Sequence, residues 1–235
     1  MSLPVAILAG GLATRLRPIT EKIPKSLVDV AGKPFIVHQL EYLQRQGIAR
    51  VVLCLGYLGE QVEAVVGDGS VFGLNVRYSY DGSRLLGTGG ALRQALPLLG
   101  DRFFSFYGDS YLPIDFLAVE MDFLTCGKPA LMTVLKNSDM WDKSNVLFQD
   151  GQITEYNKHA PRPEMAYIDY GLGLLSASVL DNVSTDEPFD LADIYHELSV
   201  RGLLAGYEVF ERFYEIGSHK GLDETIKYFR KAGNG

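Results

Sequence analysis

The feature that most constrains the fold is the apolar run at residues 3–9, which stops abruptly at Gly10 and Gly11. A short apolar run bounded by glycine is typical of a fully buried strand that enters a turn. A second run at 103–107, rich in aromatic residues, ends at a glycine in the same way. We therefore expect buried strands whose following loops meet at one edge of a sheet.

Segments with helical spacing separate these runs. Residues 35–46 follow a proline and precede a glycine, which marks both ends of a helix. Alternation of strands and helices is typical of a parallel sheet, and it continues with strands at 50–55 and 74–80 and helices at 60–66 and 89–98. The second half predicts a more mixed arrangement, with strands at 130–135, 171–175, 203–210 and 213–216, a hairpin of 145–149 and 152–156, and helices at 191–201 and 222–231.

Length and charge limit the classes of protein that fit. A chain of 235 residues can bury one substantial core, so we expect a single α/β domain over residues 1–235. The net charge of −7, with no run of Lys and Arg, argues against a nucleic acid polymer as partner. No run approaches the ~20 apolar residues of a membrane span, and the two cysteines lack metal or redox spacing. We expect a cytoplasmic protein away from membranes; self-association stays open.

The loop after the first strand carries the residue types that phosphate binding needs. Gly10 and Gly11 permit close approach of the backbone, and successive N–H groups in such a loop form a concavity for anions. Arg15 offers a forked donor for phosphate oxygens, and Lys25 offers a compact charge. The glycines alone are equally consistent with a structural turn, but the Thr-Arg-Leu and Pro-Lys that accompany them favour phosphate chemistry.

These motifs resemble the sugar-1-phosphate nucleotidyltransferase family, whose hallmark is L-x-G-G-x-G-T-R-L followed by P-K. The resemblance continues through residues 32–34, 56–57, 86–91 and 108–109, so it covers at least the first half of the chain strongly. It implies a Rossmann-like fold with a mixed, mostly parallel sheet flanked by helices. It also implies an NTP and a sugar 1-phosphate as substrates and Mg²⁺ as cofactor.

The resemblance assigns roles residue by residue. As catalytic residues it implies Arg15, which would hold the departing β- and γ-phosphates, and Lys25, which would stabilise charge on the α-phosphoryl group. Nucleotide contacts are implied for Leu8, Ala9, Gly10, Gly11, Ala13, Thr14, Asp81, Gly87, Thr88 and Gly108. Contacts with the sugar phosphate are implied for Gly89, Glu155, Lys158, Asp169 and Gly171, and metal binding for Asp109 and Glu215.

Three positions depart from the family pattern. Ala13 stands where glycine is usual, so a positive φ there would be strained by its Cβ. Glu215 stands in place of the usual Asp of a D-x-G motif, and Asp169 in place of the Asn of N-A-G. Structural roles stay open for several sites: a turn cap for Asp109, a salt bridge for Glu215 and a surface pair for Glu155 and Lys158.

The expected reaction is attack of the sugar phosphate on the α-phosphorus of the NTP, which releases pyrophosphate and leaves an NDP-sugar. The compact chain resembles the guanylyl- and uridylyltransferases, and we lean toward GTP with heptose or mannose 1-phosphate for cell-surface polysaccharide; UTP with an amino sugar 1-phosphate is the variant. Residues 1–110 would mainly bind nucleotide and 111–235 the sugar phosphate. One alternative is a choline-phosphate-type cytidylyltransferase, which the sequence Gly-Thr-Gly-Gly-Ala at residues 87–91 disfavours. The other is an inactive nucleotide-sensing subunit.

Overall fold

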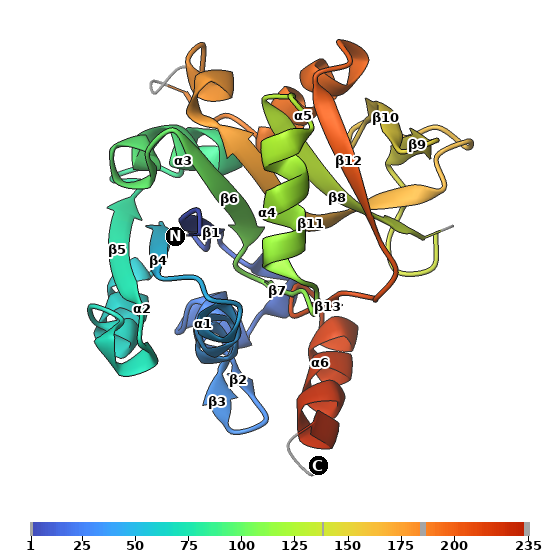
Figure 1. The fold of residues 1–235 in the computed structure, drawn as a ribbon. Helices are drawn as coiled ribbons and strands as arrows, with labels where there is room; N and C mark the ends of the chain where they lie inside the picture. Colours follow the sequence, from blue (N-terminus) through green and yellow to red (C-terminus); the bar gives the residue numbers. More distant parts are fainter. Residues whose placement is uncertain (1, 138, 184–186, 233–235) are drawn as a thin grey trace.

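Nine strands form one sheet in the part of the chain that the computed structural model describes, residues 2–137, 139–183 and 187–232 (Figure 1). Their spatial order is β5 (Asn75–Tyr80), β4 (Arg50–Leu55), β1 (Val5–Leu8), β6 (Arg102–Tyr107), β11 (Tyr167–Ser176), β8 (Ala130–Lys136), β12 (Leu204–Val209), β10 (Gln152–Tyr156) and β9 (Val146–Gln149). The first four pair in parallel. Since β11 and β10 run against their neighbours, the predicted mixed α/β sheet is confirmed.

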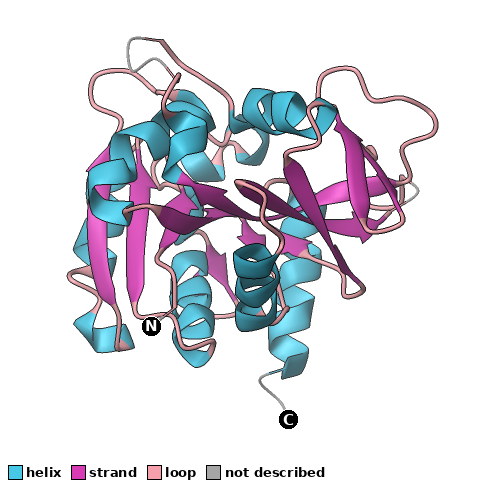
Figure 2. Ribbon diagram, turned by 45° about the horizontal axis from the view of Figure 1, so that its top comes forward, coloured by secondary structure: helices cyan, strands magenta, loops and turns pink. Residues whose placement is uncertain are grey.

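Helices cover both faces of this sheet (Figure 2). One face packs against α1 (Phe35–Arg45), α2 (Gly59–Val66) and α4 (Phe116–Thr125), and the other against α3 (Gly87–Leu99) and α5 (Leu191–Val200). The alternation of a strand explains this division, because Val5 and Ile7 belong to the first core and Ala6 to the second. In the described part of the chain, no helix has the length and apolar character to cross a membrane.

The parallel register brings the loops of the first half to one edge of the sheet. Leu8, at the end of β1, pairs with Cys54 of β4 on one side and with Tyr107 of β6 on the other. The loops that follow these three strand ends therefore start side by side. In open α/β sheets, ligands bind at this carboxyl edge.

A third, smaller core packs against the loops at this edge. It joins Leu16 of the glycine loop to Phe35 of α1 and to Ile216, which follows β13 (Tyr214–Glu215). Strand β13 pairs with β7 (Ser110–Tyr111), and α6 (His219–Ala232) closes the chain. A short pair, β2 (Asp29–Val30) and β3 (Lys33–Pro34), completes this region.

Helix α4 was not predicted, because apolar residues lie on both its buried and its exposed side. Phe116, Val119 and Phe123 are buried, but Leu117 and Met121 on the opposite side are 56% and 61% exposed. A helix that is apolar all round shows no amphipathic period. Strand β11 also begins at residue 167 rather than 171, and its pairing with β8 changes register between 169 and 173.

Candidate active site

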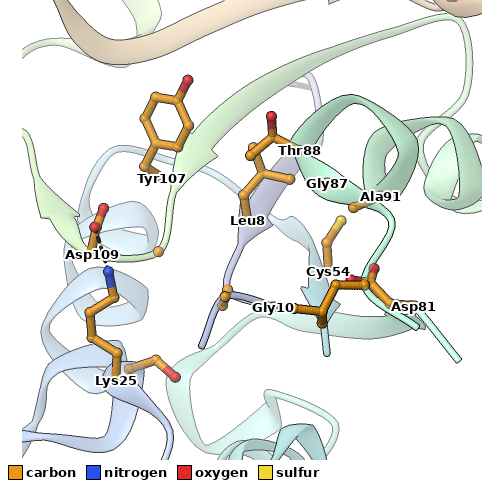
Figure 3. Close-up of a pocket in the computed structure, with 15 residues that line it drawn as sticks. Leu8, Gly10, Lys25, Cys54, Asp81, Gly87, Thr88, Ala91, Tyr107 and Asp109 are labelled. Atoms are coloured by element: carbon orange, nitrogen blue, oxygen red, sulfur yellow. Dashed lines mark hydrogen bonds and ion pairs between the residues drawn. The ribbon is translucent and has the colours of Figure 1, made fainter. Parts of the chain in front are cut away.

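One cavity of about 240 Å³ opens at the carboxyl edge of β1, β4 and β6 (Figure 3). The glycine loop forms one wall, and the turns after β5 and β6 form the others. Ten of the predicted site residues line it: Leu8, Ala9, Gly10, Gly11, Lys25, Asp81, Gly87, Thr88, Gly108 and Asp109. The structure therefore brings together residues that are up to a hundred positions apart in the sequence.

An ion pair marks one end of the cavity. Lys25 Nζ lies 2.7 Å from Asp109 Oδ2, and the two side chains are 22% and 29% exposed. Lys25 begins a short 3₁₀ turn after Pro24, and Asp109 follows β6. Both charges point into the space beside the glycine loop (Figure 3).

A buried glutamine holds the turn that carries Asp109. Gln39 of α1 is 1% exposed, and its Nε2 donates to the carbonyl oxygens of Tyr107, at 3.2 Å, and Ser110, at 2.7 Å. The Asp109 carbonyl accepts a hydrogen bond from Ile216 N. The backbone of this turn is therefore fixed from two sides, which limits the positions that the carboxylate can take.

Ala13 adopts the glycine-like conformation that its place in the motif predicts. Its φ is +49° and its ψ is +43°, in the left-handed region. Its carbonyl accepts hydrogen bonds from Leu16 N and from Thr20 Oγ1 at 2.8 Å, which hold the backbone in this strained state. Ala13 and Thr14 do not line the cavity; they shape the turn beside it.

Arg15, Asp109 and Glu215 converge on Gly217. A Cβ placed on Gly217 would lie 2.8 Å from Glu215 Oε2, 3.3 Å from Asp109 Oδ2 and 3.7 Å from Arg15 Nη2. Only glycine leaves this space open. Two carboxylates with a guanidinium beside them are the residue types that a cation and phosphate oxygens require.

The Glu215 carboxylate also takes part in the start of α6. It accepts hydrogen bonds from the backbone N–H groups of Gly217 and Ser218 and from the Ser218 hydroxyl. Negative charge is favourable at the start of a helix. Glu215 thus has a structural role whether or not it also contacts a ligand.

The opposite end of the cavity holds a lone acid. Asp81 Oδ2 accepts a hydrogen bond from Leu86 N, whereas Oδ1 has no hydrogen-bond partner among the described residues. The neighbouring cavity walls are Cys54, Leu85 and Ala91. Burial raises the pKa of the Asp81 carboxyl, and the bond from Leu86 opposes this shift in part.

The glycines of the GTGG segment, residues 87–90, leave room for another part of the chain. The family resemblance implied a contact between Gly89 and the sugar phosphate. A Cβ on Gly89 would lie 2.7 Å from Phe189 Cδ1, and one on Gly87 would lie 2.5 Å from Phe189 O. The space at Gly89 is therefore filled by Phe189, and Gly89 is buried away from the cavity.

The remaining residues predicted to contact the sugar phosphate do not line the cavity. Lys158 Nζ is 2.7 Å from Asp190 Oδ2. Asp169 Oδ1 accepts a hydrogen bond from Gly171 N, and a Cβ on Gly171 would lie 3.4 Å from Tyr107. Glu155 forms its ion pair with Arg162, so the alternative of a surface pair between Glu155 and Lys158 is wrong.

Several residues around the cavity were not predicted. Ser26, Cys54, Leu85, Ala91 and Tyr107 line it. Cys54 and Tyr107 end their strands at the same edge as the glycine loop, so the positions of the strand ends were a usable signal. Burial raises the pKa of the Cys54 thiol to about 12, which keeps it in the neutral form expected of a small apolar residue.

Comparison with known proteins places this arrangement in a family. Residues 5–123, about half of the chain, match the model of the nucleotidyl transferase family. The chain belongs to this family, as the sequence motifs predicted.

Individual relatives differ in how much of the chain they match. An N-acetylmuramate alpha-1-phosphate uridylyltransferase of Neisseria meningitidis is 45% identical over 113 residues, which cover 48% of this chain and 49% of that protein. The match thus spans about half the length of the relative. A D-glycero-alpha-D-manno-heptose 1-phosphate guanylyltransferase of Campylobacter jejuni is 27% identical over 214 residues, covering 90% of this chain and 93% of that one.

Solved structures confirm the fold. A structure assigned as a glucose-1-phosphate thymidylyltransferase from Bacillus anthracis matches with a TM-score of 0.86 at 24% identity, covering 97% of this chain and 96% of that one. HddC from Yersinia pseudotuberculosis, in complex with GMP-PN, matches with a TM-score of 0.79 at 24% identity, covering 97% and 100%. At this identity the likeness concerns the fold.

The packing of Gly89 generates a prediction about stability. We expect Gly89→Ala to lower the free energy of unfolding by roughly 1–3 kcal/mol, because the added methyl group must displace Phe189. Thermal unfolding of the ligand-free protein measures this. Gly11→Ala is the control, since nothing lies within 4 Å of its added Cβ. Equal melting temperatures for the Gly89 variant and the wild type would contradict the packing.

Asp169 generates a prediction about pH. Burial raises its pKa from 3.8 to about 6, so the folded state binds more protons than the unfolded state between these values. Stability should therefore fall as pH rises through this window, and the penalty is fully present above it. We expect Asp169→Asn to melt at a higher temperature than the wild type at pH 8, with the difference vanishing below pH 4. A constant difference at both pH values would contradict the assignment.

Proposed function

We propose that the protein transfers a nucleoside monophosphate from an NTP to a sugar 1-phosphate. The observation that carries the proposal is that one cavity unites the glycine loop with Lys25 and Asp109. Backbone N–H groups and one cation suit a triphosphate, and the adjacent carboxylate suits the metal that such a ligand carries. The names of the Neisseria and Campylobacter relatives describe the same class of reaction.

The reaction requires positioning and charge neutralisation more than proton transfer. An oxygen of the sugar phosphate attacks the α-phosphorus and forms the new P–O bond, while the bond from the α-phosphorus to the β-phosphate oxygen breaks. The attacking oxygen is already anionic, so no general base is needed. Lys25 would neutralise the α-phosphoryl oxygens, and Arg15 would hold the departing pyrophosphate.

Magnesium fits the acids at the end of the cavity. Asp109 and Glu215 present carboxylate oxygens to the space beside Gly217, and carboxylates with phosphate oxygens are the ligands that Mg²⁺ prefers. The two residues would hold the ion, and the ion would neutralise negative charge on the triphosphate. Among the described residues, no group of three or more His, Cys, Asp and Glu forms a complete protein site, so substrate oxygens would complete the coordination.

Asp81 supports guanine as the base. Guanine presents two adjacent donors, N1–H and the N2 amino group, which match a carboxylate that accepts through both oxygens. Uracil presents one N–H between two carbonyl oxygens, and these oxygens would face the same charge unfavourably. Oδ1 has no partner among the described residues and Oδ2 accepts only from Leu86 N, so each oxygen has room for one donor of guanine, and the site suits GTP better than UTP.

The acceptor would occupy the side of the cavity toward Tyr107, Asp169 and Lys158. Heptose or mannose 1-phosphate is our preferred acceptor, in line with the Campylobacter relative, and an amino sugar 1-phosphate is the variant that the Neisseria relative suggests. Residues 1–110 would mainly bind the nucleotide and residues 111–235 the acceptor. Such a product would serve cell-surface polysaccharide synthesis from the cytoplasm.

A second candidate is a nucleotide-binding protein that does not catalyse transfer. The engagement of Glu215 with the start of α6 favours it, because this carboxylate already accepts several hydrogen bonds. A pyrophosphate-release assay with each NTP, Mg²⁺ and a panel of sugar 1-phosphates separates the two. Release that depends on both substrates supports the transferase. Nucleotide binding without release supports the second candidate, and release with CTP and phosphocholine would point to a cytidylyltransferase.

The charged end of the cavity generates a prediction for turnover. We expect Arg15→Ala or Asp109→Ala to lower kcat by at least ~10²-fold, a size typical of lost electrostatic stabilisation, with the fold intact. Steady-state rates and far-UV circular dichroism measure this. Arg50→Ala is the matched control, because Arg50 is exposed at the amino end of β4, away from the cavity. It should retain the wild-type rate. Loss of folded structure in the first two variants would favour structural roles.

The guanine assignment generates a prediction for specificity. We expect Asp81→Asn to lower kcat/KM for GTP by at least roughly tenfold, because an amide offers one acceptor where the base needs two. The value for UTP should change far less. Competition between GTP and UTP in one assay measures the ratio directly. An unchanged ratio would show that Asp81 does not select the base.

A further inference from the structure

The GTGG segment at the start of α3 is a docking site for residues 189–191. Phe189 N donates to Leu86 O, and Phe189 O accepts hydrogen bonds from Gly89 N and Gly90 N. The same segment fills the space at two of the glycines, where any Cβ would meet Phe189 within 2.7 Å. A motif beside the nucleotide cavity is thus attached to the segment that leads into the first residue of α5.

The Thr88 side chain completes this attachment. Thr88 Oγ1 accepts a hydrogen bond from Leu191 N at 2.8 Å and donates its own proton to Asp190 Oδ1, also at 2.8 Å. A hydroxyl has one proton, and this one is committed to Asp190. Thr88 therefore faces the cavity as an acceptor only, and its position depends on residues 190 and 191.

Asp190 connects this attachment to Lys158. Its Oδ1 also accepts from Ala192 N and so caps α5, while its Oδ2 lies 2.7 Å from Lys158 Nζ. Burial would raise the pKa of Asp190, but the hydrogen bonds from Lys158, Ala192 and Thr88 outweigh it and lower the pKa. The carboxylate thus faces Lys158, which lies two residues beyond the end of β10.

We infer that Asp190 is a positioning residue that acts through Lys158. It fixes the lysine relative to the GTGG segment, so the cation that receives the acceptor's phosphate is set at a defined place beside the nucleotide cavity. A lysine ammonium has three protons, so it can keep the bond to Asp190 and still donate to a phosphate. This inference rests on the proposed function, since it takes Lys158 as a contact of the sugar phosphate.

A double-mutant cycle tests the inference. Asp190→Asn keeps an acceptor for Thr88 and an N-cap of equal quality, but it removes the charge that holds Lys158. We expect this change to raise KM for the sugar 1-phosphate by at least roughly fivefold, with KM for the NTP within about twofold. Lys158→Met should raise the same KM, and Asp190→Asn should have no further effect in that background.

The control for this cycle is Asp193→Asn. Asp193 lies on the same helix and contacts His159, at 3.1 Å, instead of Lys158. Its variant should retain the wild-type KM for both substrates. The inference is overturned if Asp190→Asn leaves or lowers the KM for the sugar phosphate, or if its effect is equally large without Lys158.

Chemical labelling gives a readout that does not need activity. Acetylation of lysines in the ligand-free protein, followed by mass spectrometry, compares Lys158 with the exposed Lys143. We expect Asp190→Asn to raise the rate at Lys158 alone, because the ion pair no longer shields the amine. An unchanged acetylation rate at Lys158 would overturn the inference that Asp190 holds this lysine. Absence of transfer with every sugar phosphate, together with the expected labelling, would instead count against the proposed function.

Discussion

The candidate site depends on the contact between Lys25 and Asp109, two opposite charges held 2.7 Å apart at the end of the cavity. An ion pair of this exposure contributes on the order of 1 kcal/mol or less. A ligand that brings phosphate oxygens to the lysine and a metal ion to the carboxylate can therefore separate the pair at little cost. The rest of the local architecture, from Gln39 beneath the turn to the Pro24 turn beside it, keeps the two charges in position for that exchange.

Much of the fold was predictable because its strands end where glycines interrupt apolar runs. The run at residues 3–9 and its counterparts gave the parallel half of the sheet, and helical spacing gave the helices between them. Helix α4 escaped because Leu117 and Met121 make its outer side as apolar as its inner side. The first residues of β11 were not predicted to be part of the strand, because Asp169 lies within it and breaks the apolar pattern.

The candidate site was predictable at its nucleotide end and much less so at its acceptor end. Local motifs predict Gly11, Lys25 and Asp109 as site residues. They lie close together because the loops that carry them meet at one edge of the sheet. The role of Asp190 could not be read from its neighbours in the sequence, because it arises from contacts with residues 88 and 158. The packing role of the GTGG glycines could not be predicted for the same reason, because the segment for which they leave room lies about a hundred residues away in the sequence.

A crystal structure with Mg²⁺ and a non-hydrolysable GTP analogue tests the central claim most directly. We expect the triphosphate against Gly11, the amine of Lys25 moved from Asp109 to phosphate oxygens, and the guanine edge at Asp81. A nucleotide bound elsewhere, with Lys25 and Asp109 still in contact and the cavity filled by side chains, would contradict it.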